Sequence, residues 1–256
     1  MAGAGRNRTV DGIRGCLAVV VLASHVLQSH GSNALFGPAS AAVAIFFALS
    51  ACVLTRSWNG RYLEFLARRF VRLWPMYALG LAAGYLLLGA EPSLAQFFWI
   101  PVSTAGNAPV ADPPAWSLTI EAWAMLAMPA FVWVSRGSSS RLTIAMVGTI
   151  VAGEVNPDAF FAWFFFLGAW ASRFELRWRM FEMPIAQWLG RISYPLYLIH
   201  VPILWYAHLP LIVSIPLAFA VAALLTETVE KWSIKASRAV RLTARHSVAA
   251  QEGFAL

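Results

Sequence analysis

The chain has 256 residues, of which 59% are hydrophobic and only 12% are charged, and its mean hydropathy is +0.64. Because an average soluble domain carries about 25% charged residues, this composition excludes an ordinary soluble globule and predicts a protein whose solvent is lipid. The net charge of +7 is typical of a membrane protein with basic cytoplasmic loops, and we expect no nucleic-acid partner.

Eight apolar stretches approach the length needed to cross about 30 Å of hydrocarbon, so we predict an all-α, polytopic transmembrane helix bundle of about eight spans. The stretches cover residues 12–29, 38–55, 71–90, 116–134, 141–156, 159–172, 189–207 and 210–227. The fifth and sixth are short and are separated only by residues 156–158. This spacing is typical of a tight helical hairpin that need not cross the membrane fully.

The basic residues are distributed unevenly between the loops. If the N-terminus is cytoplasmic, all 19 Lys and Arg residues fall on one side, and the opposite loops hold only acids: Glu91, Asp112, Glu154 and Asp158. The positive-inside rule then predicts that both termini are cytoplasmic, which an even number of spans also requires. We expect a multi-pass protein of the cell membrane, specifically of a bacterial inner membrane.

No repeat or linker interrupts the spans, so we interpret residues 1–256 as one integral membrane domain. Its core covers about 10–230, and a basic cytoplasmic tail covers 231–256. A cleaved signal peptide is the alternative interpretation of the first apolar run. That run is too long for one and is interrupted by His25, so we expect it to remain as the first span.

The first span carries two ionisable residues, which are costly in hydrocarbon and therefore candidates for function. Arg14 and His25 are eleven residues apart, which puts them on one helical face and about 16 Å apart along the axis. Ala18 and Val21 lie between them on that face. The alternative for His25 is a histidine that is simply hydrogen-bonded at the outer interface.

Glu121 lies in the fourth span, five residues after Trp116. If that span starts at the outer boundary, Glu121 lies about 7 Å below it, at the depth that His25 and His200 reach from the opposite side. A carboxylate beside an imidazole fixes its tautomer and raises its basicity, as a general base requires. The alternative is that Glu121 is a lone interfacial acid.

An arginine-rich segment leads into the third span. Arg69 and Arg72 are three residues apart and so share one helical face, and Arg68 precedes them. Guanidiniums at a membrane boundary bind phosphates bidentately, and the alternative ligand is an anionic lipid headgroup.

The seventh span presents a polar stripe of Ser193, Tyr197 and His200, at offsets of four and three residues. This stripe is consistent either with interhelical hydrogen bonding or with a role in catalysis.

These segments, in this order, resemble the signature of the membrane-bound acyltransferase-3 family. The matching segments are "VDGIRGCLAVVVLASH" at 10–25, "AIFFALSACVLT" at 44–55, "RRFVRLWPMY" at 68–77, "WSLTIE" at 116–121, "FFFLGAW" at 164–170 and "LGRISYPLYLIHVPIL" at 189–204. The resemblance implies transfer of an acyl group, often acetyl, from cytoplasmic acyl-CoA. It implies a hydroxyl acceptor on a cell-surface glycan or a small molecule.

Carried over by position, His25 matches the essential histidine of the family and Arg14 the arginine of its first helix. Arg69 and Arg72 match the arginine pair proposed to bind the coenzyme, and Glu121 matches the acid of the Trp-Ser-Leu motif. The resemblance therefore implies that His25, Glu121 and Arg14 are catalytic.

We add Arg68 to the coenzyme-binding pair, and we assign Trp116, Ser117, Tyr197 and His200 to acceptor binding. We expect no bound metal. The chain also departs from the family pattern, because members usually have about ten spans, and because Ala51 and Ala122 replace a common glycine and a frequent second glutamate.

In the mechanism we expect, Glu121 orients His25, which removes the proton of the acceptor hydroxyl, and Arg14 or a backbone donor stabilises the thioester oxyanion. Two other function classes remain open. One is a proton-coupled transporter that uses the intramembrane His and Glu. The other is a metal enzyme with His25, His200 and Glu121 as ligands.

Overall fold

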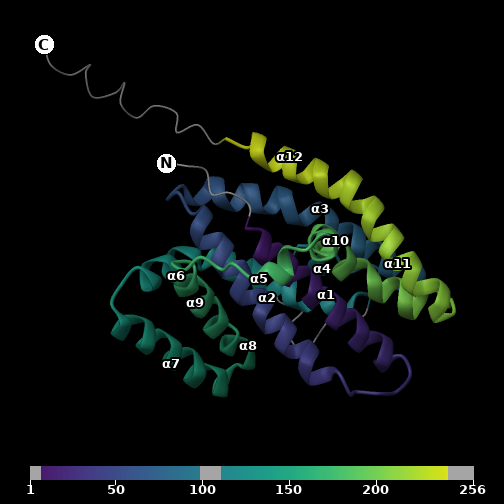
Figure 1. The fold of residues 1–256 in the computed structure, drawn as a ribbon, viewed down its shortest axis with the longest axis horizontal. Helices are drawn as coiled ribbons and strands as arrows, with labels where there is room; N and C mark the ends of the chain where they lie inside the picture. The colour runs from purple at the N-terminus through teal and green to yellow at the C-terminus, as the bar shows by residue number, and fades with distance from the viewer. Residues whose placement is uncertain (1–6, 99–110, 242–256) are drawn as a thin grey trace, which may run out of the picture.

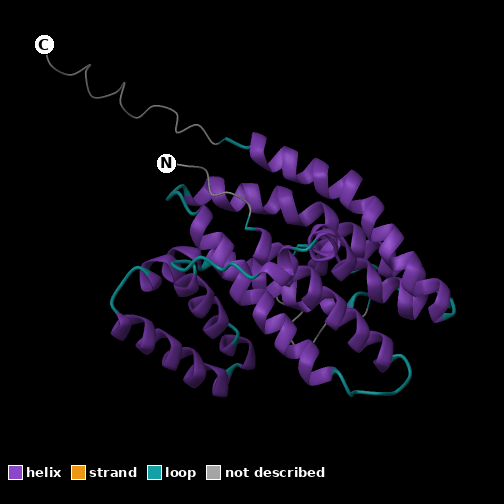
Figure 2. Cartoon of the chain, viewed as in Figure 1, coloured by secondary structure: helices purple, strands orange, loops and turns teal. Residues whose placement is uncertain are grey.

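The computed structural model describes residues 7–98 and 111–241, and every regular element in these ranges is helical (Figures 1 and 2). The longer helices are α1 (Arg8–Gln28), α2 (Phe36–Ser57), α3 (Tyr62–Leu88), α5 (Trp116–Leu126), α6 (Met128–Ser135), α7 (Ser139–Val155), α9 (Ala162–Ala171), α10 (Pro184–Val201), α11 (Leu211–Leu225) and α12 (Lys231–Ala239). The short ones are α4 (Leu94–Phe97), η1 (Pro113–Ala115), α8 (Pro157–Phe160), η2 (Arg179–Glu182), η3 (Pro202–Tyr206) and η4 (Thr226–Glu230). The all-α prediction is confirmed.

Fewer than eight of the described helices qualify as candidate membrane spans by length and apolar composition. Among the described residues, four helices are long and apolar enough to cross a membrane: Arg8–Gln28, Phe36–Ser57, Tyr62–Leu88 and Leu211–Ala239. A fifth is formed if α5 and α6, which are bent by 67° at their junction, count as one span. Two of the predicted stretches form shorter helices, since α7 has 17 residues and α9 has 10.

Helices α1 and α10 touch backbone to backbone. A Cβ added at Gly15 would overlap with the backbone of Leu189 and Gly190, and one added at Gly190 would overlap with Asp11. Because no side chain separates the helices here, they stay close along their lengths. His25 lies ten residues after Gly15, and His200 lies ten residues after Gly190, so helices that run side by side in the same direction bring the two rings together.

Helix α5 starts inside the bundle and not at a boundary. The segment that leads into it is buried: Ala111, Asp112 and Ala115 are all 0% exposed. A Cβ at Gly84 of α3 would overlap with the Ala111 carbonyl, so this segment lies against α3. The start of α5 is therefore packed within the protein.

Helices α7, α8 and α9 form the predicted helical hairpin, with the turn at residues 156–161. In Figure 1 the hairpin lies to one side of the bundle, with α9 nearer to α2. A Cβ at Gly168 of α9 would overlap with the carbonyl of Ala48 in α2, so α9 is packed closely. Helix α7 has no buried residue and lies outside α9.

The basic tail predicted to begin at residue 231 starts within a continuous helix. Helix α11 continues through η4 into α12, and the three form one apolar helix of 29 residues. The Arg68 guanidinium of α3 donates a 3.0 Å hydrogen bond to the Val240 carbonyl just after α12. The end of α12 is thus fixed beside the start of α3.

Candidate functional site

A small polar cavity lies between α1, α2, α5 and α10. Its volume is about 40 Å³, enough for a few water molecules. Its polar lining consists of Arg14, Ser50, Ser117, Glu121, Ser193, Tyr194 and Tyr197. Its apolar lining consists of Val43, Phe46, Phe47 and Leu118. Three residues assigned from the sequence to different roles, Arg14, Glu121 and Tyr197, therefore share one cavity.

His25 and His200 are directly hydrogen-bonded, with 3.0 Å between His25 Nδ1 and His200 Nε2. The other ring nitrogen of His200, Nδ1, lies 2.9 Å from the Leu196 carbonyl, which only accepts. His200 therefore carries its proton on Nδ1, and with both rings neutral its Nε2 accepts from His25 Nδ1–H. This arrangement leaves His25 Nε2 unprotonated, with a free lone pair.

The surroundings of the two rings differ. His200 is 1% exposed, whereas His25 is half-buried. Trp205 packs edge-on against the His25 ring at 5.6 Å between centroids, and its indole N–H donates to the His25 carbonyl. His200 is therefore shielded from any substrate, and His25 is the histidine that a substrate can reach.

The predicted contact between Glu121 and His25 is not formed. Glu121 accepts a short hydrogen bond from the Ser50 hydroxyl of α2 and lines the cavity with Arg14. Similar depth was not sufficient for a contact, because the Glu121 side chain bonds to Ser50 of α2 whereas the His25 ring bonds to His200 of α10. The partner of His25 is His200.

Neither His25 nor His200 lines the cavity, and the Tyr197 side chain lies between the cavity and the histidine pair. The Tyr197 ring lies 6.1 Å from the His200 ring, which lies 5.1 Å from the His25 ring. The Tyr197 hydroxyl donates to the Pro114 carbonyl at 3.1 Å and lies 2.8 Å from the Ser117 hydroxyl. The hydroxyls of Ser117 and Tyr197 thus hold α5 against α10 at the edge of the cavity.

The three arginines of α3 have different environments. Arg68 is paired with the buried carboxylate of Glu64 at 2.7 Å and bonded to Val240, so it links α3 to α12. Arg69 and Arg72 make no ion pair within 4 Å in the described ranges. Both lie within electrostatic reach of Arg14 and Glu121 beside the cavity.

These charges make one cluster with an excess of cations. Arg14, Arg69 and Arg72 oppose the carboxylate of Glu121, and Glu230 also acts on Arg72. All three guanidinium side chains are half-buried. A half-buried group of cations without a close carboxylate partner favours binding of a multiply charged anion such as a phosphate.

Trp116 does not line the cavity. Its ring packs against Phe161 at 5.2 Å and Phe47 at 6.2 Å between centroids, in the cluster that joins α5 to α2 and α9. Its contacts are those of a packing residue, whereas Ser117 beside it faces the cavity.

Two site residues were missed from the sequence. Ser50 is the partner of Glu121, and its only signal was a hydroxyl within an apolar stretch. Asp112 was placed among the outer-loop acids but is 0% exposed, and neither carboxylate oxygen has a hydrogen-bond partner among the described residues. Burial raises the pKa of the Asp112 carboxyl well above its usual range.

In the part of the chain that the structure describes, no three His, Cys, Asp or Glu side chains converge as metal ligands would. The histidine pair and Glu121 in particular belong to separate hydrogen-bond systems.

Comparison with known proteins gives the family. A curated relative, "Protein 2 in picA locus" of Rhizobium radiobacter, is 40% identical over 82 residues, which is 28% of this chain and 41% of the relative. The match thus spans about two fifths of the length of that relative. No solved structure matches the chain. The acyltransferase-3 family, described as an acyltransferase domain, matches residues 7–186, and the chain therefore belongs to this family of membrane acyltransferases.

Proposed function

We propose that the protein is an integral membrane O-acyltransferase that moves an acyl group from acyl-CoA to a hydroxyl of a cell-surface glycan or small molecule. The acyl group that we propose is acetyl. The family match supports acyl transfer. The observation that carries the proposal is the histidine pair, because it leaves His25 Nε2 unprotonated on a half-buried ring and no described residue donates to it.

In the proposed reaction His25 Nε2 takes the proton of the acceptor hydroxyl as the hydroxyl oxygen forms a bond to the thioester carbonyl. The carbon–sulfur bond then breaks, and the coenzyme leaves as a thiol after it receives that proton from His25. His200 Nε2 accepts from Nδ1–H of His25 throughout. This hydrogen bond favours the imidazolium form of His25 while it holds the proton.

Arg69, Arg72 and Arg14 are proposed to bind the phosphates of the coenzyme. Because Arg14 lies about 16 Å from His25 along the helix axis, a backbone donor near His25 is proposed to stabilise the oxyanion of the thioester. The support for phosphate binding is the excess of cations beside the cavity. Glu121, held by Ser50, offsets part of that charge when no anion is bound. Because the cavity measures about 40 Å³, the thioester arm enters only when lining side chains move.

The proposed orientation places both termini in the cytoplasm of a bacterial cell, in the inner membrane, so that acyl-CoA arrives from inside. The positive-inside rule supports this arrangement. Two contacts also support it, because each joins segments that this orientation places on the cytoplasmic side. Arg8 at the start of α1 bonds to the Glu182 carbonyl of η2, and Arg68 of α3 bonds to the Val240 carbonyl after α12.

The test uses purified protein in lipid nanodiscs with acetyl-CoA and a glycan acceptor. Release of free thiol and the gain of an acetyl mass on the acceptor are both measured. His25→Ala is expected to lower the rate by at least about 100-fold, the contribution of a general base. His30→Ala, which removes an exposed histidine just beyond α1, is the matched control and should leave the rate unchanged.

Turnover that persists in His25→Ala would refute the base assignment. Proton uptake into liposomes without any thiol release would refute acyl transfer and favour the transporter alternative.

A further inference from the structure

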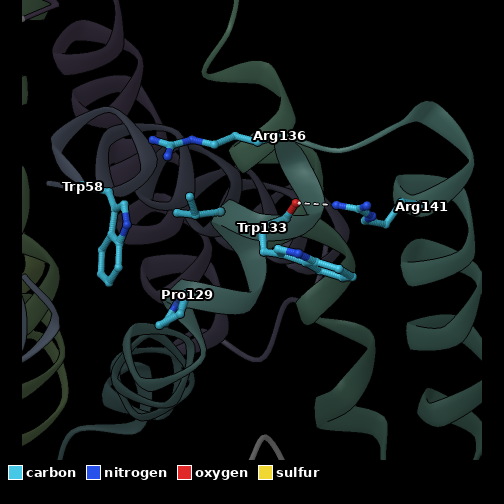
Figure 3. Close-up of a pocket in the computed structure, with 6 residues that line it drawn as sticks. Trp58, Pro129, Trp133, Arg136 and Arg141 are labelled. Carbon is cyan, nitrogen blue, oxygen red and sulfur yellow. Dashed lines mark hydrogen bonds between the residues drawn. The ribbon is translucent and has the colours of Figure 1, made fainter. Parts of the chain in front are cut away.

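A second pocket lies away from the histidines, where the ends of three helices meet (Figure 3). Its volume is about 330 Å³, and it is lined by Trp58, Pro129, Val132, Trp133, Arg136 and Arg141. Trp58 follows the last residue of α2, Arg136 follows the last residue of α6, and Arg141 lies in the first turn of α7.

The pocket carries two guanidiniums and no acid among its lining residues. Arg141 is held in place, because its Cζ lies 4.0 Å from the centroid of the Trp133 ring and its guanidinium donates to the Trp133 carbonyl at 3.4 Å. Arg136 is exposed and has neither an ion pair nor a hydrogen bond from its side chain within the described ranges. The lining therefore presents uncompensated positive charge, which favours an anion.

The tryptophans place this charge at a membrane interface. Trp133 is 62% exposed, and Trp58 lies on the other side of the pocket (Figure 3). Exposed tryptophan beside arginine at helix ends is typical of the headgroup level of a bilayer, where an indole has one face in hydrocarbon and its N–H near water.

An apolar surface continues from the pocket along α7. No residue of this helix is buried, and Ile144, Val147 and Val151 are 72%, 52% and 63% exposed. From Arg141 to Val155 the helix extends about 21 Å. A ligand with an anionic head and long hydrocarbon chains would fill the pocket and cover this surface, whereas a free phosphate would fill the pocket alone.

We propose that this pocket binds a phospholipid with a net negative headgroup, which the positive charges of Arg136 and Arg141 attract and whose acyl chains lie along α7. A zwitterionic headgroup fits less well, because its cationic end would lie beside the same guanidiniums. This site is independent of the histidine pair and of the proposed reaction.

The test reconstitutes the full chain in nanodiscs that contain equal amounts of phosphatidylglycerol and phosphatidylcholine, then measures retained lipid by native mass spectrometry. We expect one phosphatidylglycerol to remain bound preferentially. Arg136→Gln and the double variant Arg136→Gln/Arg141→Gln should lower this preference, the double variant by at least tenfold. Arg177→Gln, at an exposed arginine outside the pocket whose partner is Glu175, is the matched control.

Equal retention of the two lipids, or an equal loss in Arg177→Gln, would overturn the proposal. So would displacement of the lipid by millimolar inorganic phosphate, which would indicate a site for the free anion. Arg136→Gln removes an exposed side chain that bonds to none of the described residues, so a failure to fold is not expected to obscure the result.

Discussion

Helix pair α1–α10 and helix α7 represent two ways in which this chain uses apolar helices. In the α1–α10 pair, glycines bring the backbones into contact and polar side chains lie buried between them. In α7 nothing is buried, and a Cβ at Gly148 would meet no atom within 4 Å. Both sequences are apolar and contain glycine, so hydropathy alone does not distinguish them.

The difference shows what positions a reactive group inside a membrane bundle. A histidine in hydrocarbon is costly unless its ring nitrogens find partners. On α1 the contact between Gly15 and Gly190 brings His200 within reach of His25. On α7 there is no such contact, and its arginine lies at the helix end, where water and headgroups are close.

The strongest test of the α1–α10 arrangement beyond His25 itself is the replacement of its partner. His200→Leu removes the acceptor of the 3.0 Å hydrogen bond, so the tautomer and orientation of His25 are no longer fixed. We expect kcat to fall by about 100-fold with little change in KM, as when a residue that orients a base is lost. His200→Gln supplies an amide oxygen as acceptor and should keep the rate within about tenfold of the wild type.

A structural role alone would make the two variants lose activity in step with their thermal stability. The ¹⁵N spectrum of His25 separates the interpretations, because our assignment requires a protonated Nδ1 and an unprotonated Nε2 in the wild type. A spectrum with the proton on Nε2 would contradict it.

A smaller effect is expected from substitution of the arginines of α3. Arg68 has an ion-pair partner among the described residues, whereas Arg69 and Arg72 do not. Arg69→Gln and Arg72→Gln should each raise KM for acetyl-CoA by about tenfold or more, since a charge-assisted hydrogen bond is worth about 1.5–3 kcal/mol. Arg68→Gln is the matched control on the same helix. It should lower thermal stability, because Glu64 is only 4% exposed and loses its 2.7 Å partner, and it should leave KM unchanged.

If Arg68→Gln raised KM as much as Arg69→Gln and Arg72→Gln, Arg68 would also bind the coenzyme, as predicted from the sequence. Kinetics at saturating acceptor, with acetyl-CoA varied, are the relevant measurement.

The sequence was sufficient for the helical fold, the short hairpin and the shared polar face of α1. It also contained the equal spacing that brings the two histidines together. Ten residues separate Gly15 from His25, and ten separate Gly190 from His200. The sequence placed His25, Glu121 and His200 at a similar depth in the membrane. Depth does not give the direction of a side chain, so both Glu121 and His200 were possible partners of His25. The structure selects His200 over Glu121.

The burial of the segment before α5 was not predicted from the sequence. Counting down from Trp116 assumes that a tryptophan marks the interface, whereas residues 111–115 fold back among buried groups before α5 begins. Hydropathy does not reveal that residues 111–115 are buried, because this segment consists of alanine and proline around one aspartate. Hydropathy also did not reveal that the last helix continues through residue 239, because its final turns are polar.

Glycine substitutions test the contrast between the two regions by stability. Gly15→Ala would place a Cβ within the backbone of Leu189 and Gly190, and overpacking of this kind costs about 1–3 kcal/mol. Gly148→Ala on α7 meets open space and should be neutral or stabilising by up to about 1 kcal/mol, because alanine favours helix. Thermal unfolding of both variants in the same detergent gives the comparison, and equal melting temperatures would contradict it.

The smallest expected effect concerns Asp112 and depends on pH. Burial raises the pKa of this carboxyl in the folded state, so the folded state holds the proton more tightly than the unfolded state. Stability is then highest below the unfolded pKa of about 3.9 and falls as pH rises above it, towards the folded pKa. Asp112→Asn keeps the shape without the charge, so it should match the wild type near pH 4 and melt at a higher temperature near pH 8.

Glu154→Gln, at an exposed acid on α7, is the control and should change neither value. If Asp112→Asn were less stable than the wild type across the whole pH range, the carboxylate would be charged and paired in the folded protein. The buried segment before α5 would then be held by an ion pair. The protein would in that case bury a charged carboxylate as well as the neutral polar side chains of the α1–α10 pair.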